Sequence, residues 1–474
     1  MSTPVTDVIS KRSTSTHVLQ YLDNYPDLMT PGQFDVLRQM EYERLDAENH
    51  VYLDFTGGNL YAVSQVRRHM QFLNNKVLGN PHSINPTSLA ATQFVENARK
   101  AVLDFFNARD YICIFTANAS AALHIVGECY PFTNESHLLL LSDNHNSVNG
   151  IREYCKRKGG RYSYCLVDHN NEMRIHDDQL QHELASHPAT DTKLFAYPAQ
   201  SNVTGVKHDL QWIERAHAAG WDVLLDAAAF VPTDILDLSQ VKPDFVSVSF
   251  YKIFGYPTGL GCLLVHKDSF DRLVKPAFAG GTITLVSVGA KRHFLMPGHE
   301  RFENGTVNYL SIPAVEIGLD YINAVGLKYI RNRVIMLTSL LLEELTALEH
   351  RTGKALVRII GPVNAVQRGG TIAMNFYNEQ GEEYPFQRIE QEANRWNISL
   401  RTGCFCNPGI DELAHNIGAD ELRRYFNSTD QGDYYDAIAF LGKLRGSVRI
   451  SVGFITNVQD ITRFIAFARS FLNR

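Results

Sequence analysis

Val246-Ser-Val-Ser-Phe-Tyr-Lys-Ile-Phe-Gly-Tyr-Pro-Thr-Gly-Leu-Gly261 is an apolar strand pattern that runs into a turn rich in Gly and Pro. Lys252 follows the strand directly, and a lysine there is costly unless it is paired, neutral or covalently bound. The ordinary interpretation is a lysine whose ammonium reaches solvent at a strand end. The neighbouring Ser249 hydroxyl and the Gly-rich loop instead favour a lysine that binds pyridoxal phosphate through a Schiff base.

Short apolar runs of the same kind recur on both sides of this stretch. They alternate with helical patterns such as Ser120–Glu128 and Asn146–Lys156. Such alternation predicts an α/β fold, with βα units that form a mostly parallel, seven-stranded sheet covered by helices on both faces. The runs are Tyr111–Phe115, Ser136–Leu141, Tyr162–Val167, Lys193–Tyr197, Asp222–Leu225, Phe245–Ser249 and Gly261–Val265.

The order of the predicted strands and helices divides the chain into three segments. Residues 1–45 form an N-terminal arm with a helix that begins at Pro31-Gly32, and residues 46–313 form the large domain. Residues 314–474 contain a linking helical pattern and a smaller α+β domain. The strands expected in the smaller domain are Val357–Ile360, Thr371–Phe376 and Ser447–Val452, followed by a helix from Asp460.

The 474 residues are 45% hydrophobic and 20% charged, and the formal net charge is -6. This composition is typical of a globular protein and excludes disordered, collagen-like and small disulfide-rich chains. The acidic balance argues against nucleic-acid binding, because the only compact basic run is 156–158. No apolar run approaches the roughly 20 residues of a membrane span or resembles a signal peptide, so we expect a cytoplasmic protein without membrane contact.

Three polar positions follow apolar runs and are candidate site residues. Asp226 could pair with a pyridine nitrogen or cap a helix. Ser120, in the small-residue loop 116–120, could bind a phosphate at a helix start or serve only as a cap. His145 could stack on a cofactor ring or move protons, although a turn histidine without a function is commoner.

Two of the seven cysteines lie in the unusual segment Arg401-Thr-Gly-Cys-Phe-Cys-Asn-Pro-Gly409. An exposed thiol beside an arginine has more thiolate character and is more nucleophilic. A zinc site needs further ligands, and only His415 is close in sequence, so we expect no metal. A Cys404–Cys406 disulfide or an inert surface loop remains open.

Taken in order, these segments resemble the class V aminotransferase family of fold-type I pyridoxal-phosphate enzymes, and in particular the cysteine desulfurases. They are most similar to the desulfurase-like N-terminal domain of molybdenum cofactor sulfurases, over about residues 50 to 470. The motifs that carry the resemblance are Asn80-Pro-His-Ser83, Ser249–Gly261, Phe302-Glu-Asn-Gly-Thr306, Arg401–Gly409 and Gly446-Ser-Val-Arg-Ile-Ser451.

The resemblance implies a role for each matching residue. Lys252 would hold the cofactor and shuttle the substrate's α-proton, Asp226 would pair with the pyridine nitrogen and His145 would stack on the ring. Cys406 would attack the sulfur of L-cysteine, which leaves a persulfide and alanine, and Cys404 would be a helper, a resolving thiol or a bystander. The resemblance also implies phosphate contacts from Ala119, Ser120, Ser249 and, across a homodimer, Thr282, and substrate contacts from Asn202, Arg401 and Arg449.

The sequence departs from the family pattern at three places. Ala229 replaces a glutamine that contacts the ring's phenolic oxygen, and we expect Gln200 to take over this contact. Tyr251 replaces a histidine before the lysine, which weakens one phosphate contact. The chain stops at Arg474, without the C-terminal domain of a cofactor sulfurase, so desulfuration to an unknown acceptor is better supported than delivery to molybdenum cofactor.

The leading hypothesis is therefore a cysteine desulfurase that uses pyridoxal phosphate. A second hypothesis is another class V reaction, by an aminotransferase, an epimerase or a C–S lyase, in which Cys406 is idle. A third is a non-catalytic scaffold of the same fold, against which the presence of Lys252 and Asp226 argues.

Overall fold

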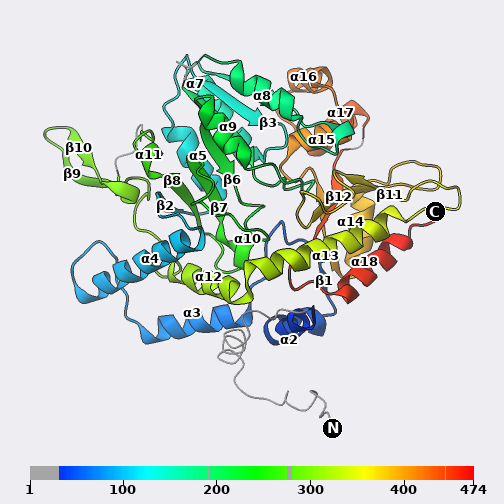
Figure 1. Cartoon of the computed structure of the whole chain (residues 1–474), viewed down its shortest axis with the longest axis horizontal. Coiled ribbons are helices and arrows are strands. Elements are labelled where there is room, and N and C mark those ends of the chain that lie inside the picture. Colours follow the sequence, from blue (N-terminus) through cyan, green and yellow to red (C-terminus); the bar gives the residue numbers. More distant parts are fainter. Residues whose placement is uncertain (1–30, 189–191, 275–279, 444) are drawn as a thin grey trace, which may run out of the picture.

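The computed structural model describes residues 31–188, 192–274, 280–443 and 445–474. The first 30 residues of the predicted N-terminal arm lie outside this range. The predicted helix at Pro31 is α2 (Pro31–Ala47), and it packs against the C-terminal part of the chain (Figure 1). Phe34 and Phe454 have ring centroids 6.3 Å apart, and Arg38 Nη1 lies 2.5 Å from Asp460 Oδ2.

The central sheet has seven strands in the order β2-β8-β7-β6-β5-β3-β4. The neighbours from β7 to β4 pair in parallel, whereas β8 runs antiparallel to both β2 and β7. The prediction of a mostly parallel seven-stranded sheet is confirmed. The strands are β2 (Tyr111–Thr116), β3 (His137–Leu141), β4 (Arg161–Cys165), β5 (Lys193–Pro198), β6 (Asp222–Asp226), β7 (Phe245–Ser249) and β8 (Gly261–His266).

Both faces of this sheet are buried. Leu138 and Leu140 of β3 belong to one apolar cluster, and Leu139 and Leu141 to the other, as the two-residue period of a strand requires. The segment Asn146–Lys156, which we predicted as one helix, forms two helices that meet at Gly150. The elements around the sheet are α3 (Val63–Asn75), α4 (Pro86–Phe105), α5 (Ala119–Cys129), α6 (Asn146–Asn149), α7 (Ile151–Arg157), η2 (His169–Asn171), α8 (Asp177–Ala185), α9 (Gln211–Ala218), α10 (Phe250–Phe254), α11 (Lys267–Phe270) and η3 (Gly298–Arg301).

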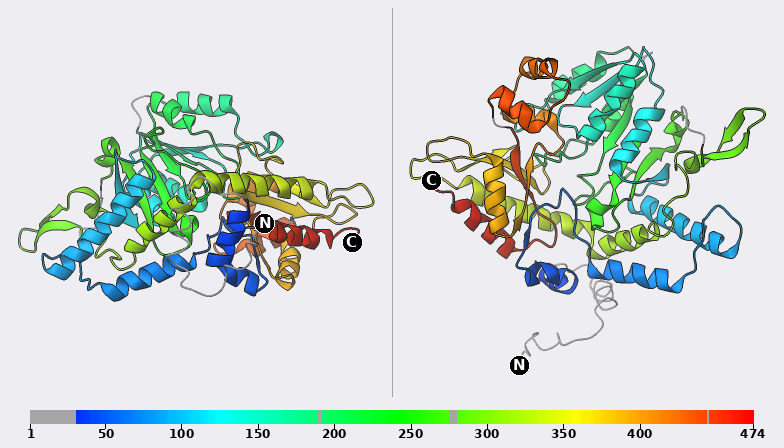
Figure 2. Two further views of the ribbon diagram at one scale, coloured as in Figure 1. Left: turned by 60° about the horizontal axis from the view of Figure 1, so that its bottom comes forward. Right: turned by 180° about the vertical axis from the view of Figure 1, so that it is seen from behind.

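Two consecutive helices, α12 (Pro313–Val325) and α13 (Leu327–Thr346), lead from the large sheet to a second sheet (Figures 1 and 2). This antiparallel sheet has the order β11-β12-β15-β14, and it contains the three strands predicted there. Its strands are β11 (Val357–Ile360), β12 (Thr371–Phe376), β14 (Arg401–Gly403) and β15 (Ser447–Ser451). Its helices are α14 (Phe386–Arg395), α15 (Pro408–Ala414), α16 (Ala419–Ser428), α17 (Tyr434–Leu441) and α18 (Val458–Arg469).

One further pairing crosses the predicted boundary between the two domains. Strand β1 (Val51–Tyr52) pairs in parallel with β13 (Ile398–Ser399), and Ser451 N–H donates to Leu53 O at 2.7 Å. The segment that follows β1 is thereby fixed against the second sheet. The predicted divisions after residues 45 and 313 stay predictions.

A hairpin that we did not predict projects from the body of the molecule (Figure 1). It consists of β9 (Ile283–Ser287) and β10 (Arg292–Leu295), which pair in antiparallel. Within the described ranges, no helix combines the length and the apolar character that crossing a membrane requires.

Candidate active site

A cavity of about 180 Å³ lies at the carboxyl ends of β5, β6 and β7. Open α/β sheets bind their ligands at this edge. Most of the residues that we predicted for the site line this one cavity, although they come from distant parts of the chain. They are Ala119, Ser120, His145, Gln200, Asn202, Asp226, Ser249, Tyr251 and Lys252.

Lys252 lies in the short helix α10, immediately after β7. Burial lowers the pKa of its ammonium below the usual range; the Asp226 carboxylate opposes this effect, and Arg449 adds to it. Asp226 ends β6, and its Oδ1 accepts hydrogen bonds from Ser247 Oγ (2.9 Å) and Ala228 N–H (3.1 Å). These two bonds orient the carboxylate toward the cavity that it lines.

His145 lies in the turn after β3 and caps α6. Its Nδ1 accepts the Ser147 N–H at 3.1 Å, so the proton of the neutral ring is on Nε2. Burial lowers the pKa of His145, with Asp226 raising it and Lys252 lowering it. The imidazole is therefore neutral at neutral pH and keeps one N–H donor at Nε2.

The wall formed by the start of α5 is suited to an anion. Asn118 caps this 11-residue helix, and Ala119 N–H donates to Ser249 Oγ at 2.8 Å. Ser120 Oγ lies 2.6 Å from Ser147 Oγ, and both residues line the cavity. Two hydroxyls therefore lie beside the N-terminus of α5 in the cavity wall. Backbone N–H groups at a helix start, together with hydroxyls, are a common binding site for phosphate.

The motif Phe302–Thr306 stabilises this wall through Glu303. The buried Glu303 accepts from Phe115 N–H at 2.8 Å and pairs with Arg99 at 2.8 Å. Phe115 lies near the end of β2, the strand that leads into α5. Glu303 therefore helps to fix the position of the helix start.

Two predicted substrate-binding residues, Arg401 and Arg449, lie outside the cavity wall and share one carboxylate. Asp54 Oδ1 accepts from Arg449 Nη2 at 2.9 Å, and Asp54 Oδ2 accepts from Arg401 Nη2 at 2.6 Å. Arg449 is buried, and its Nη1 donates to Asn202 O at 3.0 Å. Its Nε is buried without a partner among the described residues, so this guanidinium keeps a donor to spare.

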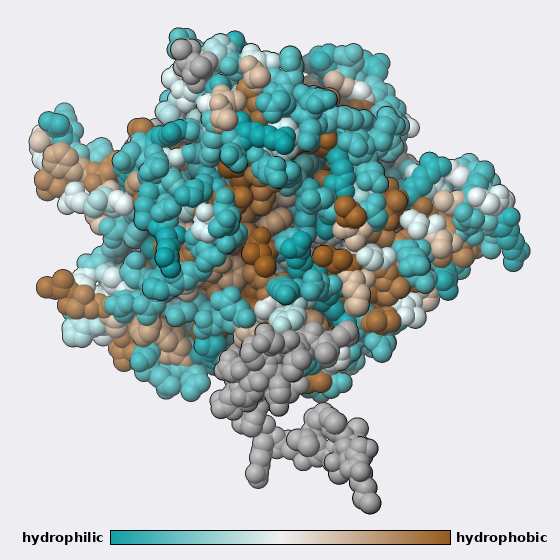
Figure 3. All heavy atoms as spheres, viewed as in Figure 1, coloured by the Kyte–Doolittle hydropathy of each residue, from teal (hydrophilic) through white to brown (hydrophobic). Residues whose placement is uncertain are grey.

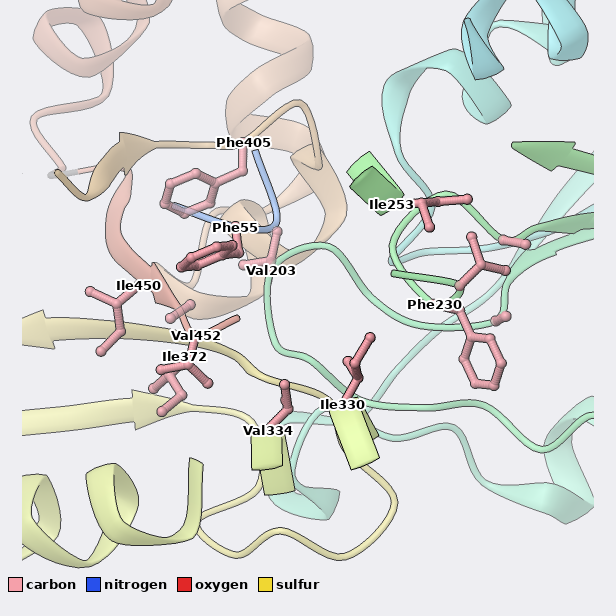
Figure 4. Packing of buried hydrophobic residues seen from close by; sticks show 14 of the residues in the cluster. Phe55, Val203, Phe230, Ile253, Ile330, Val334, Ile372, Phe405, Ile450 and Val452 are labelled. Carbon is pink, nitrogen blue, oxygen red and sulfur yellow. The ribbon is translucent and has the colours of Figure 1, made fainter. Parts of the chain in front are cut away.

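The cysteine loop has a tightly fixed backbone. Phe405 (φ 56°) and Cys406 (φ 54°) both adopt the left-handed conformation, which costs about 1–3 kcal/mol for each residue that is not glycine. Phe405 is buried in the apolar cluster with Phe55 and Val203 (Figure 4), and burying such a ring stabilises the loop by about 1.5–3 kcal/mol. The packing of Phe405 thus offsets part of the strain.

Hydrogen bonds attach the same loop to the cavity. Cys406 O accepts from Asn146 N–H at 2.7 Å, next to His145. The fully buried Asn407 donates from Nδ2 to Asp143 O (2.7 Å) and to Asn202 Oδ1 (3.0 Å). The Cys406 residue is exposed, although it is not among those that line the cavity.

Cys404 differs from Cys406 in its surroundings. It is partly buried, and burial raises the pKa of its thiol. Both cysteines are free thiols. Among the residues that the structure describes, no three His, Cys, Asp or Glu side chains come together as metal ligands.

The contacts of Asn202, Gln200 and Thr282 bear on the roles predicted for them. The Asn202 amide is engaged at both ends, because it also donates to Phe405 O at 2.8 Å. Gln200 and Ala229, the position of the missing family glutamine, both line the cavity. Thr282 is buried just before the projecting β9 and does not line the cavity of its own chain.

Sequence reasoning missed Asp54, Ser147 and Asn407. Ser147 is two residues after His145, and Asn407 follows Cys406, so proximity to a predicted site residue was an available signal. Asp54 follows the two-residue β1 and is separated by 347 residues from Arg401. No signal in its local sequence marked it.

The residues present fit pyridoxal phosphate. The helix start offers N–H groups and hydroxyls for a phosphate, Asp226 offers a carboxylate for a protonated pyridine nitrogen, and Lys252 offers an amine. Gln200 Oε1 is buried without a hydrogen-bond partner among the described residues. An amide with an unused polar atom at the cavity can serve a polar group of a ligand.

The chain belongs to the class V aminotransferase family, whose model matches residues 51–464. Enzymes of this family depend on pyridoxal phosphate. The fold is shared with an apo cysteine desulfurase from Thermococcus onnurineus NA1, with a TM-score of 0.76 and 23% identity over 94% of this chain and 99% of that one. It is also shared with a C-DES mutant that has glycine covalently linked to the cofactor, with a TM-score of 0.69 and 17% identity over 91% of this chain and 99% of that one.

The sequence is similar to molybdenum cofactor sulfurases, as predicted. The identity is 35% to the protein of Solanum lycopersicum, over 93% of this chain and 57% of that protein. It is also 35% to the protein of Homo sapiens, over 92% of this chain and 51% of that protein. The chain thus spans somewhat more than half the length of these curated relatives.

Proposed function

We propose that this chain is a cysteine desulfurase that uses pyridoxal phosphate. It converts L-cysteine to L-alanine and carries the released sulfur as a persulfide on Cys406. The observation that carries the proposal is the bond from Asn146 N–H to Cys406 O (2.7 Å), which docks an exposed cysteine onto the turn that holds His145. This bond supports Cys406 as the nucleophile for the substrate's sulfur, because it attaches the Cys406 backbone to the residue after His145, which lines the cavity.

Several residues would hold the cofactor. Lys252 would bind it covalently, Asp226 would pair with the pyridine nitrogen and His145 would lie against the ring. Bound pyridoxal phosphate supplies an electron sink for breaking bonds at the α- and β-carbons of an amino acid. The phosphate would contact Ala119, Ser120, Ser249 and Ser147, with Tyr251 nearby and Gln200 at the phenolic oxygen.

The chain's own groups would handle protons and sulfur. The lowered pKa of Lys252 favours a neutral amine that accepts the α-proton. The Cys406 thiolate attacks the substrate's sulfur; the S–S bond forms as the Cβ–S bond breaks, and Cβ then gains a proton. L-cysteine and the Cys406 thiol therefore yield L-alanine and Cys406–S–SH, without an external oxidant or reductant.

A second candidate is a C–S lyase or another class V reaction in which Cys406 is idle. The exposed Cys406 does not line the cavity, which favours this alternative. Release of sulfur as free sulfide or persulfide would then need no protein thiol. The intact pair of Lys252 and Asp226 argues against a scaffold without catalysis.

We also propose a homodimer in the cytoplasm, with Thr282 completing the phosphate site of the partner. Thr282 lies just before the projecting hairpin and does not line the cavity of its own chain, which supports this arrangement, although dimer formation must expose the Thr282 side chain that is buried in the single chain. The persulfide would pass to a thiol or other sulfur acceptor outside the chain. We propose no nucleic-acid partner, in line with the net charge of -6.

The test compares three variants with L-cysteine as substrate. Lys252→Ala is expected to lose the cofactor's visible absorbance and all alanine formation, whereas the exposed Lys267→Ala serves as its control. Cys406→Ser is expected to keep the absorbance and to lose sulfide release in the presence of a thiol reductant. Unchanged sulfide release in Cys406→Ser would favour the lyase.

A further inference from the structure

Asp54 lies between the two arginines that the resemblance assigns to the substrate carboxylate. Its carboxylate lies between Arg449, which is buried, and Arg401, whose side chain is 52% exposed. Thr56 N–H donates to Ser451 Oγ at 2.8 Å, which fixes the segment after Asp54 against β15. The three side chains therefore form one held unit with two positive charges and one negative charge.

We propose that Asp54 is a positioning and specificity-determining residue that limits the two arginines to one substrate carboxylate. The unit has a net charge of +1, which a single carboxylate neutralises. The amino acid that this site takes is then one with an uncharged side chain, such as L-cysteine, and acidic amino acids such as L-aspartate are rejected. The proposal rests on the proposed function for its choice of an amino-acid substrate.

The geometry explains how the second carboxylate is excluded. Arg401 Nε and Nη2 both face Asp54, at 3.0 and 2.6 Å from Oδ2, so this guanidinium already has its carboxylate. Arg449 donates from Nη1 to Asn202 O and from Nη2 to Asp54 Oδ1, and its buried Nε is the nitrogen without a partner among the described residues. A second carboxylate would lie beside Asp54 without a free cation, and like charges at about 4 Å repel appreciably near a protein surface.

The measurement is isothermal titration calorimetry of the cofactor-loaded protein with L-alanine and with L-aspartate. We expect the wild type to bind L-aspartate at least about tenfold more weakly than L-alanine. Asp54→Asn frees Arg401 for a second carboxylate and should reduce this preference by about tenfold or more. Asp54→Glu keeps the negative charge and should keep the preference for L-alanine over L-aspartate.

The control is Asp46→Asn, which also removes a carboxylate paired with an arginine, Arg38, but on the distant helix α2. This control should leave the preference for L-alanine over L-aspartate unchanged. If the preference of Asp54→Asn for L-alanine over L-aspartate stays within twofold of the wild-type value, the proposal is overturned.

Arg401→Gln tests the same charge count without altering Asp54. It leaves Arg449 and Asp54 as a neutral pair, so L-alanine should bind about tenfold more weakly. Unchanged binding of L-alanine would contradict the charge count. Neither result depends on turnover, so a protein that releases no sulfur would refute the desulfurase while leaving this test intact.

Discussion

At the scale of single residues, burial and, after it, the neighbouring charges set the pKa of Lys252. Burial lowers the pKa of its ammonium, Arg449 adds to this effect and Asp226 opposes it. An amine that is neutral nearer physiological pH is the form that attacks an aldehyde and accepts a proton. The same environment keeps His145 neutral by lowering its pKa.

Lys252 in the cofactor-free protein should therefore react with acetic anhydride at a lower pH than an exposed lysine. Its rate should rise as the pH rises through its folded pKa, with a midpoint below the ordinary value of 10.5. Asp226→Asn removes the effect that raises this pKa, so the midpoint should fall further. Mass spectrometry of the labelled peptides measures both midpoints, with the exposed Lys267 as an internal reference.

A midpoint for Lys252 equal to that of Lys267 would contradict the burial of its amine. A rise of the midpoint in Asp226→Asn would contradict the assigned direction of the Asp226 effect.

Site residues could be predicted from the sequence where they lie at or shortly after the end of an apolar run. Lys252, Asp226 and His145 each occupy such a position, and parallel strands bring their carboxyl ends to one edge. Asp54 could not be predicted, because its partners lie on β14 and β15 and only tertiary packing joins them. The second role of Asn202, in holding the cysteine loop, also depends on packing.

At the scale of elements, the cysteine loop is held by contacts with the turn that follows β3 of the large sheet. Asn407 links the turn after β3 to the start of α15, and its Oδ1 accepts from Ile410 N–H. Gly409 packs so closely on Ser142 that an added Cβ would lie 1.8 Å from the Ser142 carbonyl oxygen. The loop therefore has little freedom to move while these contacts are intact.

Asn407→Ala should release the loop, because it removes two buried hydrogen bonds and a helix cap. We expect a loss of about 2–4 kcal/mol in the free energy of unfolding. The Cys406 thiol should react several-fold faster with a thiol reagent, because its docked backbone becomes mobile. Denaturant unfolding and the rate of thiol modification measure the two effects.

Asn457→Ala is the matched control, since Asn457 caps α18 far from the loop. It should reduce stability by about 0.5–2 kcal/mol without changing the Cys406 rate. Equal Cys406 rates in Asn407→Ala and the wild type would show that Asn407 does not hold the loop.

At the scale of the whole molecule, the projecting hairpin carries exposed apolar side chains (Figure 3). Val288 is 93% exposed and Phe294 61%. Apolar groups gathered on one projection are typical of an interface with another protein. The residues of β9 and β10 show no alternation that predicts strands, so the element that contacts a partner could not be predicted from the sequence.

If the hairpin joins two copies, then Val288→Glu combined with Phe294→Glu should shift the protein from dimer to monomer in analytical ultracentrifugation. Cofactor affinity should fall in parallel, because Thr282 would no longer reach the partner's phosphate site. Phe426→Glu is the control, since Phe426 is 69% exposed on α16. A dimer that withstands the hairpin changes would place the interface elsewhere.

The central claim is that Cys406 takes sulfur from L-cysteine. The most direct measurement is incubation of the cofactor-loaded protein with L-cysteine in the absence of reductant, followed by mass spectrometry of the peptide that contains Arg401–Gly409. The account predicts the mass of one added sulfur atom on Cys406, with one alanine formed for each sulfur bound. Continued alanine formation with an unmodified Cys406 would contradict it.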